Sequence, residues 1–252
     1  MSLYRFDIAY DGTEFSGWQV QNSGPTIQGT LESALFTITR QTVRITGAGR
    51  TDAGVHAKGQ VAHTRFESPP PIEHLKRALN GLLPHSIRVL HISVAPEGFH
   101  SQKSAVKKEY HYHICLDDVV LPFVRPYVWH CRRAVTVDLL VEASRKFVGE
   151  HDFRAYSNAP GRGCERRTTV RTIFRLDVVR TDTGVRLEFE GNGFLYKMVR
   201  NITGMMVSVA SGRCRLEDID EVFLSKDRRL AAPAAPPQGL FLMHVSYKEN
   251  SL

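Results

Sequence analysis

One carboxylate, that of Asp52, stands in a glycine-rich segment, GAGRTDAGVHA, at residues 47–57. Glycine accepts positive φ and lets the backbone approach other groups closely, so Gly47, Gly49 and Gly54 predict a loop of defined shape. A carboxylate held in a fixed orientation can serve as a nucleophile. An aspartate beside a glycine also commonly caps its own turn. The pattern alone leaves both roles open for Asp52.

Two other kinds of site fit this loop poorly. Its glycines do not follow G-x-G-x-x-G, and a strand-like segment comes next instead of the helix whose N-terminus would hold a phosphate. A metal site would need further ligands at suitable spacing, and His56 is the nearest candidate. We therefore expect neither a nucleotide cradle nor a metal at Asp52.

Arg200 lies in a strongly apolar stretch, FLYKMVRNITGMMVSV, at residues 194–209. Arginine is rarely buried without a partner because its desolvation is costly. An anionic group should therefore meet it, and Asp52 is a candidate whose charge a guanidinium would stabilise. Two alternatives stay open: Arg200 reaches solvent with its charged end, or it binds a phosphate directly.

Aromatic and basic residues alternate in KSAVKKEYHYH, at residues 103–113. In a strand, every second side chain shares a face. One face would carry Lys108, Tyr110 and Tyr112, and the other Lys107, Glu109, His111 and His113. Such a strand could stack a base on a ring while lysines meet the RNA backbone, although the tyrosines could equally belong to the core.

The charge of the chain favours a polyanionic partner, with nucleic acid as the first candidate. It has 33 Lys and Arg against 26 Asp and Glu, a net charge of +7 and a pI near 9.4. A second basic run follows residue 153, and it reads either as an arm that grips phosphates or as a solvated loop. Its arginines are Arg154, Arg162, Arg166, Arg167 and Arg171.

Composition predicts a folded cytoplasmic protein. A chain of 252 residues with 42% hydrophobic and 23% charged residues can bury a substantial core. The start, MSLYRFDIAY, lacks the apolar region of a signal peptide, and charged residues interrupt the most apolar stretch, so no membrane partner is expected. Four cysteines far apart in the chain suggest neither a zinc site nor a disulfide framework.

Periodicity predicts the elements that must position these residues. The first half reads as strand, helix, strand, strand, helix, strand, the split βαβ order. Its predicted strands are 3–10, 42–49, 57–66 and 87–95, and its helices are 27–40, which Thr26 would cap, and 72–83. The Asp52 loop joins the second and third of these strands.

The second half repeats the order with additions. Its predicted strands are 106–115, a hairpin over 170–191 that turns at Thr183-Gly184, and 239–247, and its helices are 136–149, 194–211 and 216–225. The fold class is therefore α+β, with two ferredoxin-like halves, 1–104 and 105–252. We expect the halves to join into one large antiparallel sheet flanked by helices, with a central basic cleft.

Taken together, these segments resemble the tRNA pseudouridine synthases of the TruA family over nearly the whole chain. GRTDAGVHA is the most specific of them. The segments that carry the resemblance are YDGTEFSGWQVQ (10–21), GAGRTDAGVHA (47–57), KKEYHYHI (107–114), GEHDF (149–153), GNGFLYKMVRNITG (191–204) and APPQGL (235–240).

The resemblance implies a homodimer without a cofactor that isomerises uridines of the tRNA anticodon stem-loop, at positions 38–40, by base flipping. On this likeness Asp52 is the nucleophile, Arg200 pairs with it, and Tyr110 contacts the uracil. Arg50 and Leu240 would also bind the substrate. Asp52 would attack C1′ of the ribose or C6 of uracil, or withdraw a ribose proton, and the sequence leaves these routes open.

Two other functions compete with this interpretation. A catalytically silent RNA-binding module could use the same ferredoxin-like sheet, although its strands lack the RNP1 pattern of RNA-recognition motifs. A metal-dependent nuclease would cleave the chain and depend on a divalent ion. Tritium release from C5-labelled uridine and the integrity of the RNA distinguish the three.

Overall fold

The computed structural model describes residues 1–158 and 168–248. The chain divides into two compact units, and each is described by itself. The first contains Met1–Lys107 and the described residues from Phe241 onward, and the second is Lys108–Leu240. The predicted boundary was between residues 104 and 105. The structure has it at Lys107 and Lys108, and the closing strand belongs to the first unit.

The first unit contains the strand-helix-strand-strand-helix-strand order predicted from periodicity, followed by most of the last strand. Its elements are β1 (Ser2–Tyr10), α1 (Ile27–Thr39), β2 (Thr46–Gly47), β3 (His56–Phe66), α2 (Ile72–Leu82), β4 (Ile87–Val94) and β10 (Leu240–Tyr247). The strand order is β4-β1-β3-β10, and β2 also pairs with β3. The pairs of β1 with β3 and β4 are antiparallel, and β10 runs parallel to β3.

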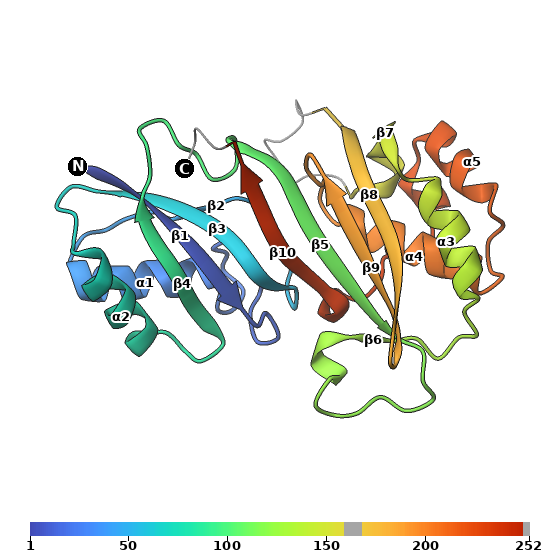
Figure 1. The fold of residues 1–252 in the computed structure, drawn as a ribbon, viewed down its shortest axis with the longest axis horizontal. Helices are drawn as coiled ribbons and strands as arrows, with labels where there is room; N and C mark the ends of the chain where they lie inside the picture. The colour runs from blue at the N-terminus through green and yellow to red at the C-terminus, as the bar shows by residue number, and fades with distance from the viewer. Residues whose placement is uncertain (159–167, 249–252) are drawn as a thin grey trace. The chain divides into compact units, whose positions relative to one another are not determined.

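Alternation of apolar and polar residues explains β1. Tyr4, Phe6, Ile8 and Tyr10 are buried, and the residues between them are half-buried. Helix α1 begins as predicted at Thr26, whose side chain accepts a hydrogen bond from the Gly29 N–H at 3.2 Å. Helices α1 and α2 pack against each other next to the strands of the first unit (Figure 1).

The strand predicted over 42–49 is much shorter in the structure, where only Thr46–Gly47 pairs as β2. Side chains of α1 take the place of a strand partner at Ile45. The Ile45 N–H donates to Glu32 at 3.0 Å, and its carbonyl accepts from Gln28 at 3.2 Å. Because the N–H and the carbonyl of Ile45 already have hydrogen-bond partners, the chain at Ile45 needs no neighbouring strand to satisfy its backbone.

The second unit has its strands in the order β5-β9-β8-β7, and β6 pairs with β5. Its strands and α-helices are β5 (Ala105–Cys115, beginning in the first unit), β6 (Trp129–His130), α3 (Val137–Arg145), β7 (Gly149–Asp152), β8 (Val170–Thr181), β9 (Gly184–Gly191), α4 (Met198–Ala210) and α5 (Asp218–Ser225). Its 3-10 helices are η1 (Arg125–Tyr127), η2 (Phe153–Tyr156), η3 (Arg228–Leu230) and η4 (Pro237–Gly239).

Two helices of this unit differ from their predicted bounds. The helix predicted over 136–149 ends at Arg145. Gly149 takes φ 110°, so it cannot continue the helix, and it opens the short strand β7, which the pattern did not indicate. The helix predicted from residue 194 begins at Met198, because Lys197 takes φ 59°. A left-handed residue cannot lie inside a right-handed helix.

The α+β class is confirmed, with ten strands and five α-helices in the part of the chain that the structure describes. Two strand pairs, β3 with β10 and β5 with β6, run parallel, so the strand arrangement is mixed. Among these same residues the longest α-helices have 13 residues and none could span a bilayer, for which about 20 apolar residues are needed.

Candidate active site

Asp52 lies on the connection between β2 and β3 in the first unit. It is half-buried, and the following residues turn back so that the Val55 N–H donates to the Asp52 carbonyl at 3.1 Å. Gly54 completes the turn with φ 75°, a conformation that L side chains rarely adopt. The glycine loop predicted from the sequence is thus a tight turn, with Asp52 as its first residue.

The residue directly before Asp52 is fixed on two sides. Thr51 is buried, and its hydroxyl shares a hydrogen bond of 2.8 Å with the Tyr10 phenol of β1. Its carbonyl accepts from the Trp18 N–H at 3.1 Å. The backbone that carries Asp52 is therefore tied to β1 and to the segment after it, and little freedom is left at its N-terminal side.

Tyr10 is part of a longer chain of hydrogen bonds under the loop. Gln60 of β3 donates from Nε2 to the Gly49 carbonyl at 2.9 Å and to the Tyr10 oxygen at 3.4 Å. Burial raises the pKa of Tyr10 to about 12, with the hydrogen bonds from Thr51 and Gln60 acting in the opposite direction. Tyr10 therefore stays a neutral phenol at physiological pH, and in its hydrogen bond with the Thr51 hydroxyl either oxygen can be the donor.

The segment YDGTEFSGW, residues 10–18, packs closely against the loop that carries Asp52. A Cβ at Gly12 would lie 2.0 Å from the Val55 carbonyl oxygen, and one at Gly17 would lie 2.6 Å from the Thr51 carbonyl oxygen. Real Cβ atoms essentially never come so close to backbone. The glycines at these two positions are therefore required by close approach to the loop that carries Asp52.

His56 supports the other end of the loop. It is 1% exposed and stacks on Phe241 of β10 with ring centroids 4.6 Å apart. Its Nδ1 lies 3.1 Å from the Gly12 N–H nitrogen and also 3.1 Å from the Asp11 carboxylate. His56 was weighed from the sequence as a metal ligand, and the structure has it bridging β3 to the Asp11-Gly12 turn.

Arg50 is exposed on the same loop, two residues before Asp52. Together with Trp18, Arg44 and Gln102 it lines a pocket of about 190 Å³ in the first unit. The loop thus presents a carboxylate and a guanidinium close together in the chain. The sequence indicated Arg50 as a substrate contact, but it gave no sign of the pocket.

Tyr110 lies on β5 in the second unit. It is 7% exposed, and its ring meets the edge of Phe194 at 5.1 Å between centroids. Tyr112, two residues on, is fully buried against Trp129, whereas Glu109 and His111 of the other face interact with polar side chains. The predicted division of β5 into an aromatic face and a charged face is confirmed for these residues.

Arg200 stands in the first turn of α4 and is half-buried. Its Nε–H donates to the Ala235 carbonyl at 2.8 Å, and the Ala235 N–H donates back to the Arg200 carbonyl at 2.9 Å. Burial raises the pKa of Tyr112, and the positive charge of Arg200 opposes this rise. Arg200 is therefore anchored to the proline-rich loop before β10. Its predicted pairing with Asp52 stays a prediction.

Leu240, the last predicted substrate contact, begins β10 and is 6% exposed. The loop before it is held by Tyr112, whose hydroxyl donates to the Pro236 carbonyl at 2.7 Å. Gly239 fits closely here, because a Cβ would lie 2.7 Å from the His113 carbonyl oxygen. Tyr112 and Arg200 thus bind neighbouring carbonyls of the segment that leads to Leu240.

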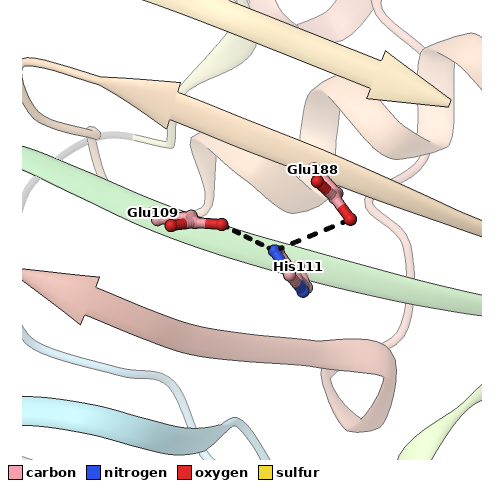
Figure 2. Close-up of side chains that lie close together, drawn as sticks. All are labelled: Glu109, His111 and Glu188. Carbon is pink, nitrogen blue, oxygen red and sulfur yellow. Dashed lines mark hydrogen bonds and ion pairs between the residues drawn. The ribbon is translucent and has the colours of Figure 1, made fainter. Parts of the chain in front are cut away.

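Three groups of the metal-ligand type, Glu109, His111 and Glu188, come together on the charged face of β5 and β9 (Figure 2). The Glu109 carboxylate lies 2.8 Å from His111 Nε2. Glu188 receives hydrogen bonds from Arg175 and Arg186, which hold the pKa of its carboxyl below the usual range although burial pushes it upward. Two guanidinium groups already balance Glu188, so the cluster is an ion-pair network.

The basic run after residue 153 is described only in part. Arg154 is exposed on η2. Arg162, Arg166 and Arg167 lie outside the described residues.

Comparison with known proteins identifies the family. The profile described as tRNA pseudouridine synthase matches residues 8–102 and 143–248. The chain belongs to the tRNA pseudouridine synthase A family. The synthase A 1 of Protochlamydia amoebophila is 47% identical over 252 residues, which cover 100% of this chain and 98% of that protein.

Other relatives carry the same name. The tRNA pseudouridine synthase A of Chlamydia muridarum is 42% identical, covering 95% of this chain and 90% of its own, and that of Oceanobacillus iheyensis is 38% identical, covering 99% and 98%. The tRNA pseudouridine synthase A family is a family of isomerases. The resemblance stated from the sequence motifs is thus confirmed.

Proposed function

We propose that this protein isomerises uridines of the tRNA anticodon stem-loop, at positions 38–40, to pseudouridine, with Asp52 as the nucleophile. The observation that carries the proposal is the fixed geometry of the Asp52 turn. The neighbouring Thr51 is held through both its hydroxyl and its carbonyl. Gly12 and Gly17 pack directly against the backbone of the loop that carries Asp52. A carboxylate on so constrained a turn is oriented before substrate binds.

The reaction rearranges bonds within one nucleotide. The C1′–N1 glycosidic bond breaks, a C1′–C5 bond forms, the proton on C5 leaves, and N1 gains a proton, so the product is an isomer of the substrate. A carboxylate can assist by attack on C1′ of the ribose, by attack on C6 of the uracil, or by withdrawal of a ribose proton. Each route uses an oriented carboxylate such as that of Asp52.

A uridine in the stem-loop must leave its stack before a carboxylate can reach it. Extruding a base costs about a few kcal/mol, and enzymes that act on bases offset this cost with contacts to the rest of the nucleic acid. A net charge of +7 supplies favourable phosphate contacts for that purpose. Base flipping is therefore part of the proposal.

The remaining site residues have proposed roles that follow the family likeness. Tyr110 contacts the extruded uracil and helps move the C5 proton, and Arg200 balances and aims the Asp52 carboxylate. Arg50 holds the displaced nucleotide or its phosphate, and Leu240 contacts the substrate. The likeness also supports action in the cytoplasm as a homodimer without a cofactor.

The direct test of this function is to incubate the protein with an unmodified tRNA transcript and map pseudouridine along the RNA. We expect pseudouridine in the anticodon stem-loop, confined to positions 38–40. Unchanged tRNA would reject the activity. Pseudouridine confined to another arm of the tRNA would retain the reaction and reject the proposed position.

A further inference from the structure

The pocket beside the Asp52 loop has an unusual lining for a small-molecule site. Such sites are mostly apolar, whereas this one is lined by long polar side chains, among them Gln19, Arg44, Arg50 and Gln102. Trp18 contributes to one wall but is 2% exposed, so its ring offers little face for stacking. The lining favours a charged, hydrogen-bonding ligand.

Two guanidinium groups of this lining are available to such a ligand. Arg44 and Arg50 are exposed, and within residues 1–158 and 168–248 neither side chain has an ion-pair or hydrogen-bond partner. Other arginines differ: Arg186 is paired with Glu188, and Arg215 with Asp218. Two unpaired guanidinium groups on one concave surface attract an anion.

The backbone that carries both arginines is fixed. The Arg44 carbonyl accepts from the Thr64 hydroxyl at 3.0 Å, and the Thr46 carbonyl accepts from the Ser101 hydroxyl at 2.7 Å. The Ala48 N–H donates to the Val61 carbonyl at 2.7 Å. Gly47 lies against Trp18, where a Cβ would be 2.6 Å from the ring. The backbone therefore has little order to gain on binding, which favours affinity.

We propose that Arg44 and Arg50, together with Gln102, form a subsite for one phosphodiester of the RNA backbone. The inference rests on the proposed function, in which RNA is the substrate and Arg50 is close in the chain to the nucleophile. A guanidinium matches a phosphate with paired N–H donors, and an amide side chain adds a further donor. The phosphodiester held here belongs to the target nucleotide or to an immediate neighbour, because Arg50 is two residues from Asp52.

Salt dependence of tRNA binding tests the subsite. Arg44→Gln removes one phosphate contact, so we expect the Kd for tRNA to rise about tenfold. The plot of the logarithm of the association constant against the logarithm of the salt concentration should become less steep, with a slope smaller in magnitude by about 1. Arg65→Gln is the matched control. Arg65 is exposed on β3, next to Thr64 in the chain and on the opposite face of the strand. Arg65→Gln should leave both quantities unchanged.

Replacing single phosphodiesters of the RNA by uncharged methylphosphonates identifies which phosphate the subsite contacts. Single methylphosphonates placed in turn around the target uridine should weaken binding by the wild type most at one linkage, and Arg44→Gln should lose clearly less affinity than the wild type at that linkage, because only Arg50 still contributes charge there. The proposal would be overturned if Arg44→Gln and Arg65→Gln changed the salt slope equally. It would also be overturned if every methylphosphonate weakened binding by Arg44→Gln as much as binding by the wild type. Should glutamine disturb folding, Arg44→Ala is the second variant, because it also removes the charge and the same two results decide the proposal.

The same RNA separates this proposal from the proposed function. Tritium release by the wild type from C5-labelled uridine is measured in parallel with the affinities. Absence of release would reject the isomerase activity while the comparison of Arg44→Gln with Arg65→Gln still decides the subsite. Normal release together with identical binding by the two variants would reject the subsite alone.

Discussion

The Tyr10 phenol and the Thr51 hydroxyl lie 2.8 Å apart in a buried hydrogen bond, which ties β1 to the residue directly before Asp52. Residues 10 and 51 are far apart in the sequence, yet their contact decides where the carboxylate next to Thr51 is held. Positioning groups of this kind influence rate because a shift of about 1 Å at a reacting group can cost a hundredfold.

Tyr10→Phe should therefore slow isomerisation by about 10- to 100-fold. It should also lower the free energy of unfolding by about 1–3 kcal/mol, because the Thr51 hydroxyl loses its buried partner. The double variant with Thr51→Val should lose less stability than the sum of the two single variants. Urea unfolding and tritium release measure the two effects.

Tyr4→Phe is the matched control for this prediction. Tyr4 lies on the same strand and donates to the Pro70 carbonyl at 2.8 Å, away from the Asp52 loop. Its loss should reduce stability and leave the rate unchanged. Equal rates for Tyr10→Phe and Tyr4→Phe would show that the Tyr10 contact does not position the carboxylate.

Gly12→Ala tests the close packing of the turn at Asp11-Gly12 against the loop. The new Cβ would meet the Val55 carbonyl oxygen at 2.0 Å, so the backbone must shift. We expect a loss of about 1–3 kcal/mol in the free energy of unfolding and a marked fall in tritium release. Thermal unfolding and the release assay check these two outcomes.

Gly81→Ala serves as the control substitution. Gly81 lies in α2, and a Cβ there would have no heavy atom within 4 Å. Alanine in place of glycine in a helix should stabilise the protein by about 0.5–1 kcal/mol. Equal stability and activity of Gly12→Ala and Gly81→Ala would show that position 12 does not have to be glycine for the loop to pack.

The pH dependence of stability should report on His63 of β3. Burial, and to a smaller extent the charge of His100, lowers the pKa of His63 from 6.5 to about 4. Its Nδ1 accepts from the Ser101 N–H at 3.1 Å, as the neutral ring can. Between these pH values the unfolded chain binds a proton that the folded chain does not, so stability should fall as pH drops from about 6.5 to about 4.

His63→Gln should make this part of the profile less steep, because the His63 contribution to the protonation difference between the folded and unfolded states disappears. His74→Gln, at an exposed position of α2, should leave the profile as in the wild type. Urea unfolding at several pH values gives the comparison. A His63→Gln profile as steep as the wild type would contradict the assignment.

Patterns of neighbouring residues in the sequence were sufficient to predict most of the strands and helices. Alternation predicted β1 and the two faces of β5, and Thr26 marked the beginning of α1. The loop of defined shape around Asp52 was predicted from its glycines, because conformational freedom is a property of the residue itself. These features depend on the few residues around each position, and a single sequence contains that information.

Contacts between distant segments were beyond such patterns. Nothing near Ile45 indicates that Glu32 and Gln28 of α1 would satisfy its backbone groups and shorten β2. The support of the loop by Tyr10 and the stacking of His56 on Phe241 are long-range in the same way. These partners are chosen by packing of the whole unit.

Asp52→Asn in the tritium-release assay tests the central claim most directly, because asparagine keeps the size of the side chain and removes its negative charge. With tRNA labelled at C5 of uridine, the wild type should release tritium, and the variant should bind the tRNA with similar affinity and release it at least about a thousandfold more slowly. Release by Asp52→Asn at the wild-type rate would contradict a nucleophilic carboxylate at position 52.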